Sequence, residues 1–267
     1  MSAAFWQEAD WPAPTGVRAG TTLRRGGSST GPWAELNLAL HVADDPAAVA
    51  ANRARLAAAL QLPAEPLWLR QVHGRDVAQH DGQDGTPTAD GAVAFGPGRV
   101  LAVLTADCLP VVLSSRDGER LGIAHAGWRG LLGGVLEATV AALDAPGKGL
   151  LAWLGPAIGP AAFEVGEEVR AAFTAADPRS AGDFAANARG RWQADLYALA
   201  RRRLRALGIE AVSGGGACTF TEEDRYFSYR RDSRAGRMAT LVWREAALTP
   251  AKPRGAVGRV PDRSLSG

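Results

Sequence analysis

The sequence is poor in cysteine and has no long apolar run. Only two of its 267 residues are cysteine, so no framework of disulfides can hold the fold, and both thiols are expected to stay reduced. No stretch reaches the roughly 20 consecutive apolar residues of a membrane helix, and the N-terminus lacks the basic-then-apolar order of a signal peptide. These absences predict a cytoplasmic protein with no membrane partner.

The chain also lacks an excess of charge of either sign. The formal net charge at pH 7 is +2, which is too small to indicate nucleic acid as a partner. Hydrophobic residues make up 46% of the chain and charged residues 22%, as in ordinary globular proteins, and the length is sufficient for a sizeable core.

The hydrophobic pattern predicts short buried strands interspersed with helices. Asp45 and Pro46 are typical of a helix N-cap and first turn, and the helix that they begin should end near Leu62. With no internal repeat or linker, the sequence predicts one α/β (α+β) domain of mixed sheets flanked by helices over residues 1–246, followed by a loose Pro, Gly and Arg-rich tail over 247–267. Strands are expected over 37–42, 100–106, 111–115, 121–126 and 150–154, and further helices over 131–143, 166–175 and 192–207. The last helix carries four arginines that we expect on a solvated face, Arg201, Arg202, Arg203 and Arg205.

Polar side chains interrupt the apolar stretch over 100–130. Cys108 follows the first strand and His125 ends the third, after a turn over 116–118 that is typical of a hairpin. Paired strands would bring these two residues to one cleft. His73 closes another apolar run and is too distant in sequence for a local zinc finger, so the fold would have to assemble the group. A His, Cys, His set leaves one open position on a tetrahedral zinc ion, as in catalytic sites; the pattern equally fits a Cys–His pair.

Other polar residues have an ordinary structural interpretation. Cys218 lies near a glycine run and is expected to be a small buried residue, and His41 and His80 lie in polar or loop surroundings. Arg53 falls on the apolar stripe of the helix that begins after Asp45. Its guanidinium either reaches solvent or pairs with a structural carboxylate, or it points into the cleft, and the sequence leaves these alternatives open.

Several motifs follow one another along the chain: QVHG at 71–74, TADCLP at 105–110, HAGWRG at 125–130, GPAIGP at 155–160 with FEVG at 163–166, and FSYRRD at 227–232 with GRM at 236–238. In this order they resemble the motifs of the laccase-domain family, and the resemblance extends from about Val17 to Trp243. That family was once called multicopper polyphenol oxidases and is now understood as multifunctional purine nucleoside phosphorylases; some relatives are proposed to edit cell-wall (peptidoglycan) precursors.

The resemblance implies a zinc enzyme that acts on purine nucleosides and phosphate. Zinc would be held by His73, Cys108 and His125, with Asn37 and Arg53 in or near the substrate and phosphate pocket. The implied reactions are phosphorolysis of adenosine, inosine and methylthioadenosine to the free base and the sugar 1-phosphate, and deamination of adenosine. The protein would be a monomer or a homodimer. Many relatives have cysteine after the Ile-Gly-Pro turn, where this chain has alanine, so those positions are not expected to take part in the chemistry.

Three alternatives stay open at this point. Copper could occupy the same ligands, but a single copper cannot supply the electrons that an oxidase needs, and four histidines are few for a multicopper cluster. Cys108 activated by His125 would instead give a metal-free cysteine hydrolase or amidase. Asp107 could move a proton or orient a ligand, and Arg129 and Arg230 could bind phosphate or brace a loop.

Overall fold

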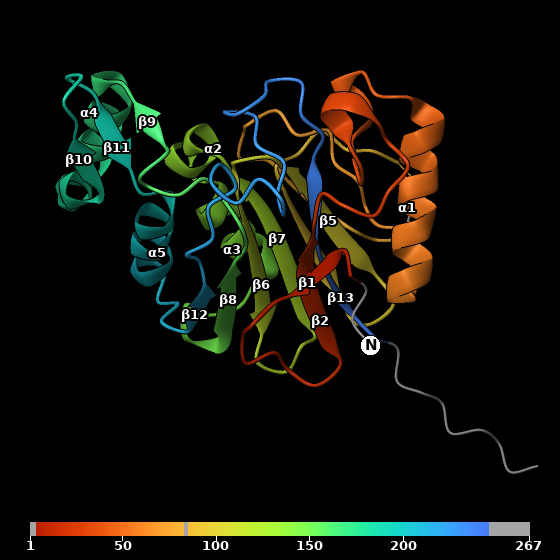
Figure 1. The fold of residues 1–267 in the computed structure, drawn as a ribbon. Coiled ribbons are helices and arrows are strands. Elements are labelled where there is room, and N and C mark those ends of the chain that lie inside the picture. Colours follow the sequence, from red (N-terminus) through yellow and green to blue (C-terminus); the bar gives the residue numbers. More distant parts are fainter. Residues whose placement is uncertain (1–3, 83–84, 246–267) are drawn as a thin grey trace, which may run out of the picture.

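Two β-sheets packed face to face form the centre of the molecule (Figure 1). The computed structural model describes residues 4–82 and 85–245. The six-stranded sheet has the order β12 (Val212–Gly214), β8 (Leu150–Leu154), β6 (Leu109–Ser115), β7 (Arg120–Ala126), β4 (Gly91–Phe95) and β3 (Val77–Gln79). The four-stranded sheet has the order β1 (Trp6–Glu8), β2 (Val17–Thr22), β13 (Met238–Arg244) and β5 (Val100–Thr105). The predicted mixed α/β fold is confirmed.

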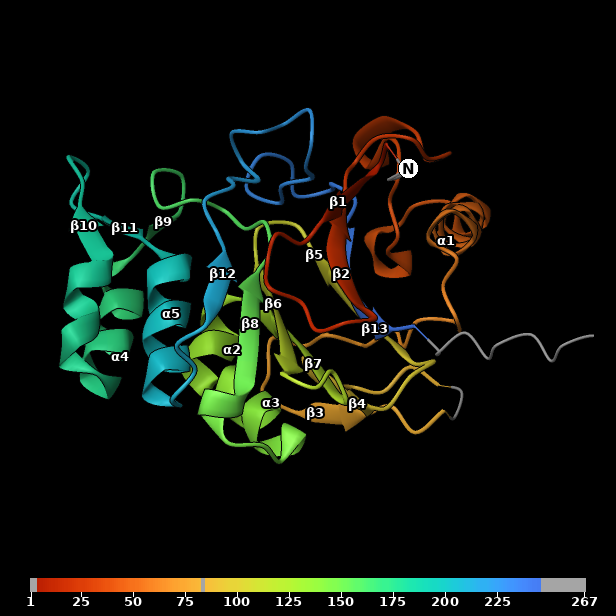
Figure 2. The same ribbon diagram turned by 90° about the horizontal axis from the view of Figure 1, so that it is seen from below.

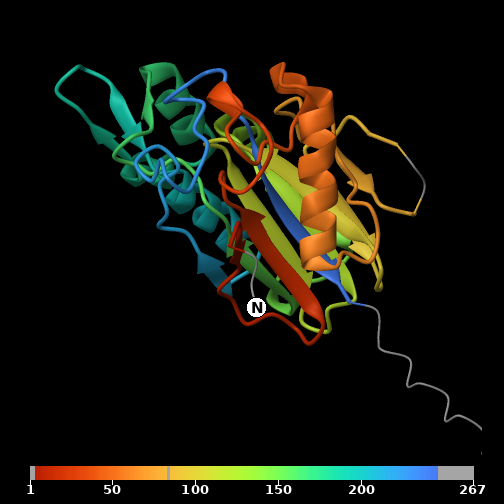
Figure 3. The same cartoon turned by 45° about the vertical axis from the view of Figure 1, so that its right-hand side comes forward.

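The central strands are continuous apolar runs because both of their faces are covered. Along β5, Leu101 and Val103 pack between the two sheets, whereas Ala102 and Leu104 pack in the core that α1 (Pro46–Leu60) shares. Side chains alternate between the faces of a strand, so a strand buried on both sides has no polar alternation. Figure 3 shows α1 in front of the four-stranded sheet.

Helices also cover the outer face of the six-stranded sheet. Leu136 of α3 (Val135–Leu143), Phe173 of α4 (Glu167–Ala176) and Leu204 of α5 (Leu196–Ala206) share one core with β6 and β8. Figure 2 shows these helices and α1 on opposite sides of the paired sheets. A small three-stranded sheet lies beside α4, in the order β10 (Phe184–Ala186), β11 (Trp192–Ala194) and β9 (Glu164–Val165). Short 3-10 helices span Gly31–Trp33, Leu40–Val42, Gly147–Gly149 and Pro178–Asp183.

Three element predictions are wrong, each for a local reason. Residues 37–42 form no strand: the Asn37 side chain bonds the backbone of Ala39 at 3.0 Å, and a 3-10 helix follows. The helix predicted over 131–143 is divided at Gly134, whose φ of 94° ends α2 (Trp128–Gly133). The helix predicted from residue 192 begins only after Asp195, whose side chain caps the Ala198 amide at 2.9 Å.

Three of the four arginines of α5 are less solvated than predicted, whereas Arg205 is exposed as expected. Arg202 forms an ion pair with Asp183 at 2.8 Å, and Arg203 forms one with Glu137 at 2.7 Å. Arg201 donates to the carbonyls of Val212 and Gly214. These side chains attach α5 to its neighbours. The helix predicted after Asp45 is confirmed, with the Asp45 side chain accepting from the Ala47 amide at 3.0 Å.

No helix in the described part of the chain has the length and apolar character needed to cross a bilayer. The tail predicted over 247–267 lies outside the described residues.

Candidate functional site

A hairpin and a crossing between the two sheets bring Cys108 and His125 together. Strands β6 and β7 pair antiparallel, with Pro110 opposite His125, as the turn over 116–118 predicted. Strand β5 belongs to the other sheet, so Cys108 lies on the short connection by which the chain passes between the sheets. Asp107, just before it, takes a φ of 91°, which turns the chain sharply at this point.

His73 joins this pair from a loop rather than from the end of a strand. The described segment around it has no named strand, and His73 itself has a φ of 59°. Gln71 attaches the loop to β5, because its side-chain amide donates to the Leu104 carbonyl and accepts from the Leu104 amide, both at 2.8 Å. One ligand atom from each of His73, Cys108 and His125 lies within 4.8 Å of the others. The structure therefore assembles the three residues that the sequence singled out.

A buried carboxylate, Asp90, orients both histidines. Its Oδ1 accepts from Nδ1 of His125 at 2.8 Å and from the His73 amide at 3.0 Å. Its Oδ2 accepts from the amides of Val72 and Gly74 at 3.0 and 2.7 Å. Since Nδ1 of His125 is occupied by Asp90, Nε2 is the nitrogen left to bind a metal. Asp90 was not among the residues predicted from the sequence, although an acidic residue directly before the apolar strand β4 is a visible signal.

Cys108 and His125 form a coupled acid–base pair. Burial alone would raise the pKa of the Cys108 thiol, but the charge of His125 and hydrogen bonds from both histidines lower it to about 6. Burial alone would lower the pKa of His125, but the Cys108 thiolate and Asp90 raise it to about 9. Near pH 7 the metal-free pair is therefore a thiolate and an imidazolium.

The group fits a zinc ion. A thiolate sulfur and two imidazole nitrogens are the donors that zinc prefers, and the carboxylate behind His125 is a common companion of such sites. Gly127 leaves the space that an ion needs, because a Cβ there would lie 2.7 Å from the Cys108 sulfur and 3.0 Å from Nδ1 of His73. Three protein ligands leave one coordination position for a fourth ligand.

The three residues open onto a cleft of about 580 Å³ whose walls carry arginines and aromatic rings. Each arginine lies over a ring that also lines the cleft: Arg129 over Trp128 at 4.4 Å, Arg230 over Phe163 at 5.6 Å and Arg237 over Tyr229 at 5.6 Å. The other lining residues are His41, Gln71, His73, Leu104, Thr105, Ala106, Asp107, Cys108, His125 and Ile158.

Asp107 holds the wall of this cleft in place. Its Oδ1 accepts from the Thr219 hydroxyl and its Oδ2 from the Arg230 amide, both at 2.7 Å. It is the one carboxylate that the structure places in the lining, and both of its oxygens are occupied. The cleft is therefore positively charged, which suits an anionic ligand.

Asn37 and Arg53 lie behind the cleft and do not line it. Asn37 is fully buried and bonded to Ala39, Asp44 and the Arg237 amide. Arg53 donates twice to the Leu38 carbonyl, at 3.0 and 2.9 Å, and lies 3.9 Å from the ring centre of Trp68. Arg53 therefore does not point into the cleft, and its partner is a backbone carbonyl in place of the expected carboxylate.

The remaining cysteine and histidines divide into two groups. Cys218 accepts from the Gly159 amide at 3.2 Å and is not part of the metal-ligand group, and His80 lies away from the cleft in its own loop. His41 does line the cleft, contrary to its interpretation as an ordinary loop residue. Burial, together with the charges of Arg237 and Arg53, lowers its pKa, so its imidazole is neutral at pH 7.

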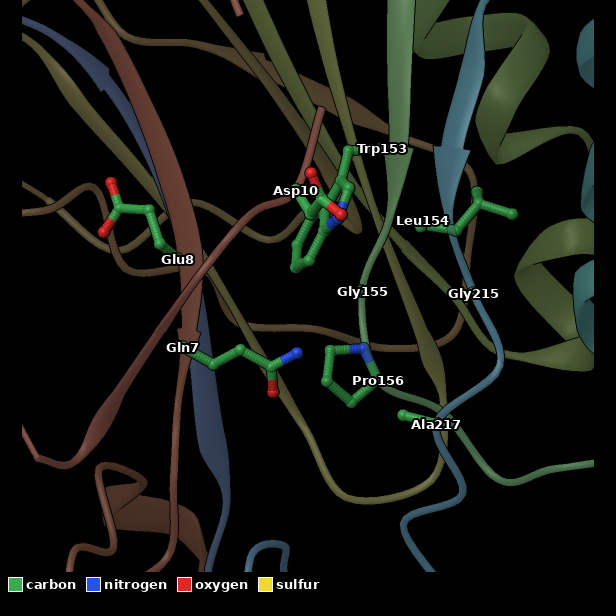
Figure 4. A pocket seen from close by; sticks show the side chains of 10 residues that line it. Gln7, Glu8, Asp10, Trp153, Leu154, Gly155, Pro156, Gly215 and Ala217 are labelled. Atoms are coloured by element: carbon green, nitrogen blue, oxygen red, sulfur yellow. The ribbon is translucent and has the colours of Figure 1, made fainter. Parts of the chain in front are cut away.

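A second hollow, of about 320 Å³, lies between β1 and the ends of β8 and β12 (Figure 4). Its polar lining includes Gln7, Glu8 and Asp10, beside Trp153 and Pro156. This lining has two carboxylates and no arginine or lysine, so the second hollow is less suited to phosphate than the arginine-lined cleft.

The fold and the site define a class of protein: a mixed α/β sandwich with a three-ligand His, Cys, His group opening onto a cationic cleft. The chain belongs to the family described as multi-copper polyphenol oxidoreductase laccase, whose model matches residues 18–245.

Proteins with a curated name are similar over nearly the whole body. The chain is 53% identical over 239 residues to "Purine nucleoside phosphorylase PA4543" of Pseudomonas aeruginosa, covering 89% of this chain and 98% of that protein. It is 50% identical over 234 residues to "Purine nucleoside phosphorylase YfiH" of Escherichia coli, covering 87% and 96%.

Solved structures agree on the fold. The crystal structure of Neisseria meningitidis protein NMB0706 has a TM-score of 0.87 at 45% identity, covering 91% of this chain and 100% of that one. The structure of YlmD from Geobacillus stearothermophilus has a TM-score of 0.86 at 32% identity, covering 92% and 98%.

Proposed function

We propose that this protein is a zinc-dependent purine nucleoside phosphorylase. One observation supports the proposal above the others: a His73, Cys108 and His125 group, suited to zinc, opens onto a cleft lined by Arg129, Arg230 and Arg237. Relatives at about half identity carry the name purine nucleoside phosphorylase, and nearly their whole length is matched.

In phosphorolysis a phosphate oxygen forms a bond to C1′ of the nucleoside while the bond from C1′ to the purine nitrogen breaks. The electron pair of that bond leaves with the purine, which takes up a proton, and the sugar 1-phosphate remains. The chain must therefore hold an anion beside the ribose and a flat aromatic base next to it. Cleft arginines meet the first need, since a guanidinium binds two phosphate oxygens at once. The exposed ring of Tyr229, with that of Trp128, meets the second by stacking.

Zinc, when bound, supplies a Lewis acid with one open coordination position. The chain's own contribution is orientation. Asp90 fixes the His125 ring, and Asp107 fixes the backbone at Arg230, so the metal ligands and the anion-binding wall keep one geometry. The substrates proposed are adenosine, inosine and methylthioadenosine. Deamination of adenosine is proposed as a second activity of the same open metal position.

A second candidate function is a metal-free cysteine hydrolase or amidase. The observation that favours it is the Cys108 and His125 pair, a thiolate beside an imidazolium in the metal-free protein. His73 argues against it, since a second imidazole at the sulfur is a feature of a metal site and is not needed to activate a thiol. A copper polyphenol oxidase has less support, because a single three-ligand group cannot store the electrons for reduction of oxygen to water.

The proposal is tested by incubating protein of measured metal content with adenosine, with and without phosphate, and separating adenine, hypoxanthine and inosine. Phosphate-dependent adenine release that tracks zinc content supports phosphorolysis, and phosphate-independent inosine supports deamination. Activity on an acyl or amide substrate in zinc-free protein, with no base released in either condition, would replace the proposal by the cysteine hydrolase.

A further inference from the structure

Arg237 differs from the other two arginines of the cleft in its surroundings. Arg129 and Arg230 are exposed, and Arg230 directs both Nη atoms to the Glu164 carbonyl at 3.2 Å. Arg237 is partly buried and lines the cleft together with Cys108 and Asp107. Burial lowers the pKa of its guanidinium, while the charges of Cys108 and Asp107 act in the opposite direction, as expected for a cation beside the metal ligands.

The backbone of Arg237 is held from both sides by one segment. Its amide donates to Oδ1 of Asn37 at 2.9 Å, and its carbonyl accepts from the Leu38 amide at 3.3 Å. The approach is close enough to require glycine at 236, where a Cβ would lie 2.8 Å from Cβ of Asn37 and 2.9 Å from Cζ of Phe227. These backbone contacts therefore fix the position from which the Arg237 side chain extends into the cleft.

Buried polar contacts fix this segment in turn. Asp44 accepts from Nδ2 of Asn37 at 2.9 Å, and Asn52 donates to the Asn37 carbonyl at 2.9 Å. Arg53 donates to the Leu38 carbonyl through Nε and Nη2. Asn37 and Arg53 thus connect to the cleft through Arg237.

The Arg237 guanidinium keeps donors for a ligand. Only Nη1 is used, on the carbonyls of Ala235 and Gly236. Within residues 4–82 and 85–245, Nε and Nη2 make no hydrogen bond and no carboxylate pairs with the side chain, whereas Arg202 and Arg203 are paired with Asp183 and Glu137. Two parallel N–H groups on a planar cation match two oxygens of a phosphate.

We propose that Arg237 binds the phosphate co-substrate, and that Asn37 and Arg53 are positioning residues that set its guanidinium from behind. The inference rests on the proposed function, since it assigns that reaction's phosphate to a residue. Under this proposal Asn37 and Arg53 affect phosphate binding indirectly, through Arg237, which agrees with their position behind the cleft.

The first test is a calorimetric titration of the zinc-loaded protein with inorganic phosphate, together with KM and kcat for phosphate and for adenosine. Arg237→Gln should weaken phosphate binding and raise the KM for phosphate by about 10- to 100-fold, and the KM for adenosine by no more than about 3-fold. Arg237→Lys keeps the charge but not the planar pair of N–H donors, so its KM for phosphate should lie between those of the unmodified protein and Arg237→Gln. This variant also tests the role of Arg237 if Arg237→Gln does not fold. Arg234→Gln is the matched control, because Arg234 lies in the same loop, exposed and paired with Asp232.

The second test separates positioning from simple stability. Arg53→Gln should raise the KM for phosphate, and this effect should vanish when Arg237→Gln is already present, because residues that act through one group are not additive. An Arg53 effect that persists in full in the double variant contradicts the positioning role.

The outcomes distinguish the inference from the proposed function. Phosphate-dependent base release with an unchanged phosphate KM in Arg237→Gln overturns the inference and leaves the phosphorylase intact. Phosphate binding that is lost in Arg237→Gln, without base release by the unmodified protein, supports Arg237 as a phosphate-binding residue and overturns the phosphorylase, and with it the role of that phosphate as a co-substrate. Absence of phosphate binding at millimolar concentration in the unmodified protein overturns the inference.

Discussion

Oδ1 of Asp90 lies 2.8 Å from Nδ1 of His125 and accepts a hydrogen bond from it, and both side chains are buried. The same carboxylate accepts hydrogen bonds from three backbone amides of the His73 loop. One buried carboxylate therefore positions two of the three residues of the site.

Asp90→Asn should lower zinc affinity by about 10- to 100-fold. Wherever the new NH2 group is placed, it faces N–H donors: the amides of Val72 and Gly74 on one side, or His73 and the His125 ring on the other. A His125 ring forced to accept at Nδ1 would carry its proton on Nε2 and lose that nitrogen as a ligand. Competition with a chelating dye measures the affinity, and Asp10→Asn is an exposed control. Equal affinity in both variants would show that Asp90 does not orient the site.

Gly127→Ala should abolish zinc binding with little loss of stability in the zinc-free protein. The φ of −64° at this position is acceptable for alanine, whereas the added Cβ would lie 2.7 Å from the Cys108 sulfur. Gly133→Ala in the same short helix is the control, because a Cβ there meets nothing within 4 Å. Metal content and melting temperature check the prediction, and full zinc content in Gly127→Ala would contradict the proposed geometry.

Removal of zinc should make Cys108 reactive at neutral pH. With a pKa of about 6 the thiol is largely ionised at pH 7, so alkylation by iodoacetamide should be fast at pH 7 and slow progressively as the pH falls below about 6. Zinc should protect the sulfur throughout. Cys218→Ala leaves Cys108 as the single cysteine, so the mass of the adduct identifies the site. A rate that begins to rise only near pH 9 would mean that the histidines do not lower this pKa.

Asn52→Ala should reduce the free energy of unfolding by about 3 kcal/mol, because it leaves several buried groups without partners. The Asn52 side chain donates to Ser29, Glu35 and Asn37 and accepts from Ser28. Ala51→Ser, exposed on the same helix, should change stability by less than about 0.5 kcal/mol. Urea unfolding compares the two, and a difference below 1 kcal/mol would show that solvent replaces these bonds.

Elements that depend on local signals were predictable from the sequence. The strands around Cys108 and His125 follow from uninterrupted apolar runs, and the start of α1 follows from the capping residue Asp45 and Pro46. The convergence of Cys108 and His125 follows from one hairpin. Their roles as zinc ligands stay predictions until a metal is measured.

Features that depend on contacts between distant segments were not predictable in this way. His41 carries no local signal, and the GRM motif does not show where Arg237 points; only contacts between distant segments bring these two residues to the cleft. Asp90 precedes an apolar strand, but its contact with His125 depends on the fold. Asn37 was expected in a strand, but its amide bonds the backbone and replaces the ladder that a strand would need. The role of Arg53 depended on its partner, the Leu38 carbonyl, which helical periodicity cannot identify.

Cys108 lies on the connection by which the chain passes from one sheet to the other, and His125 belongs to the six-stranded sheet. The His73 loop is attached through Gln71 to the four-stranded sheet and through Asp90 to the six-stranded sheet. A zinc ion bound by these ligands would connect the two sheets. Zinc binding and unfolding of the whole protein are then thermodynamically linked. Each tenfold increase of the free zinc concentration above the dissociation constant should raise the free energy of unfolding by about 1.4 kcal/mol.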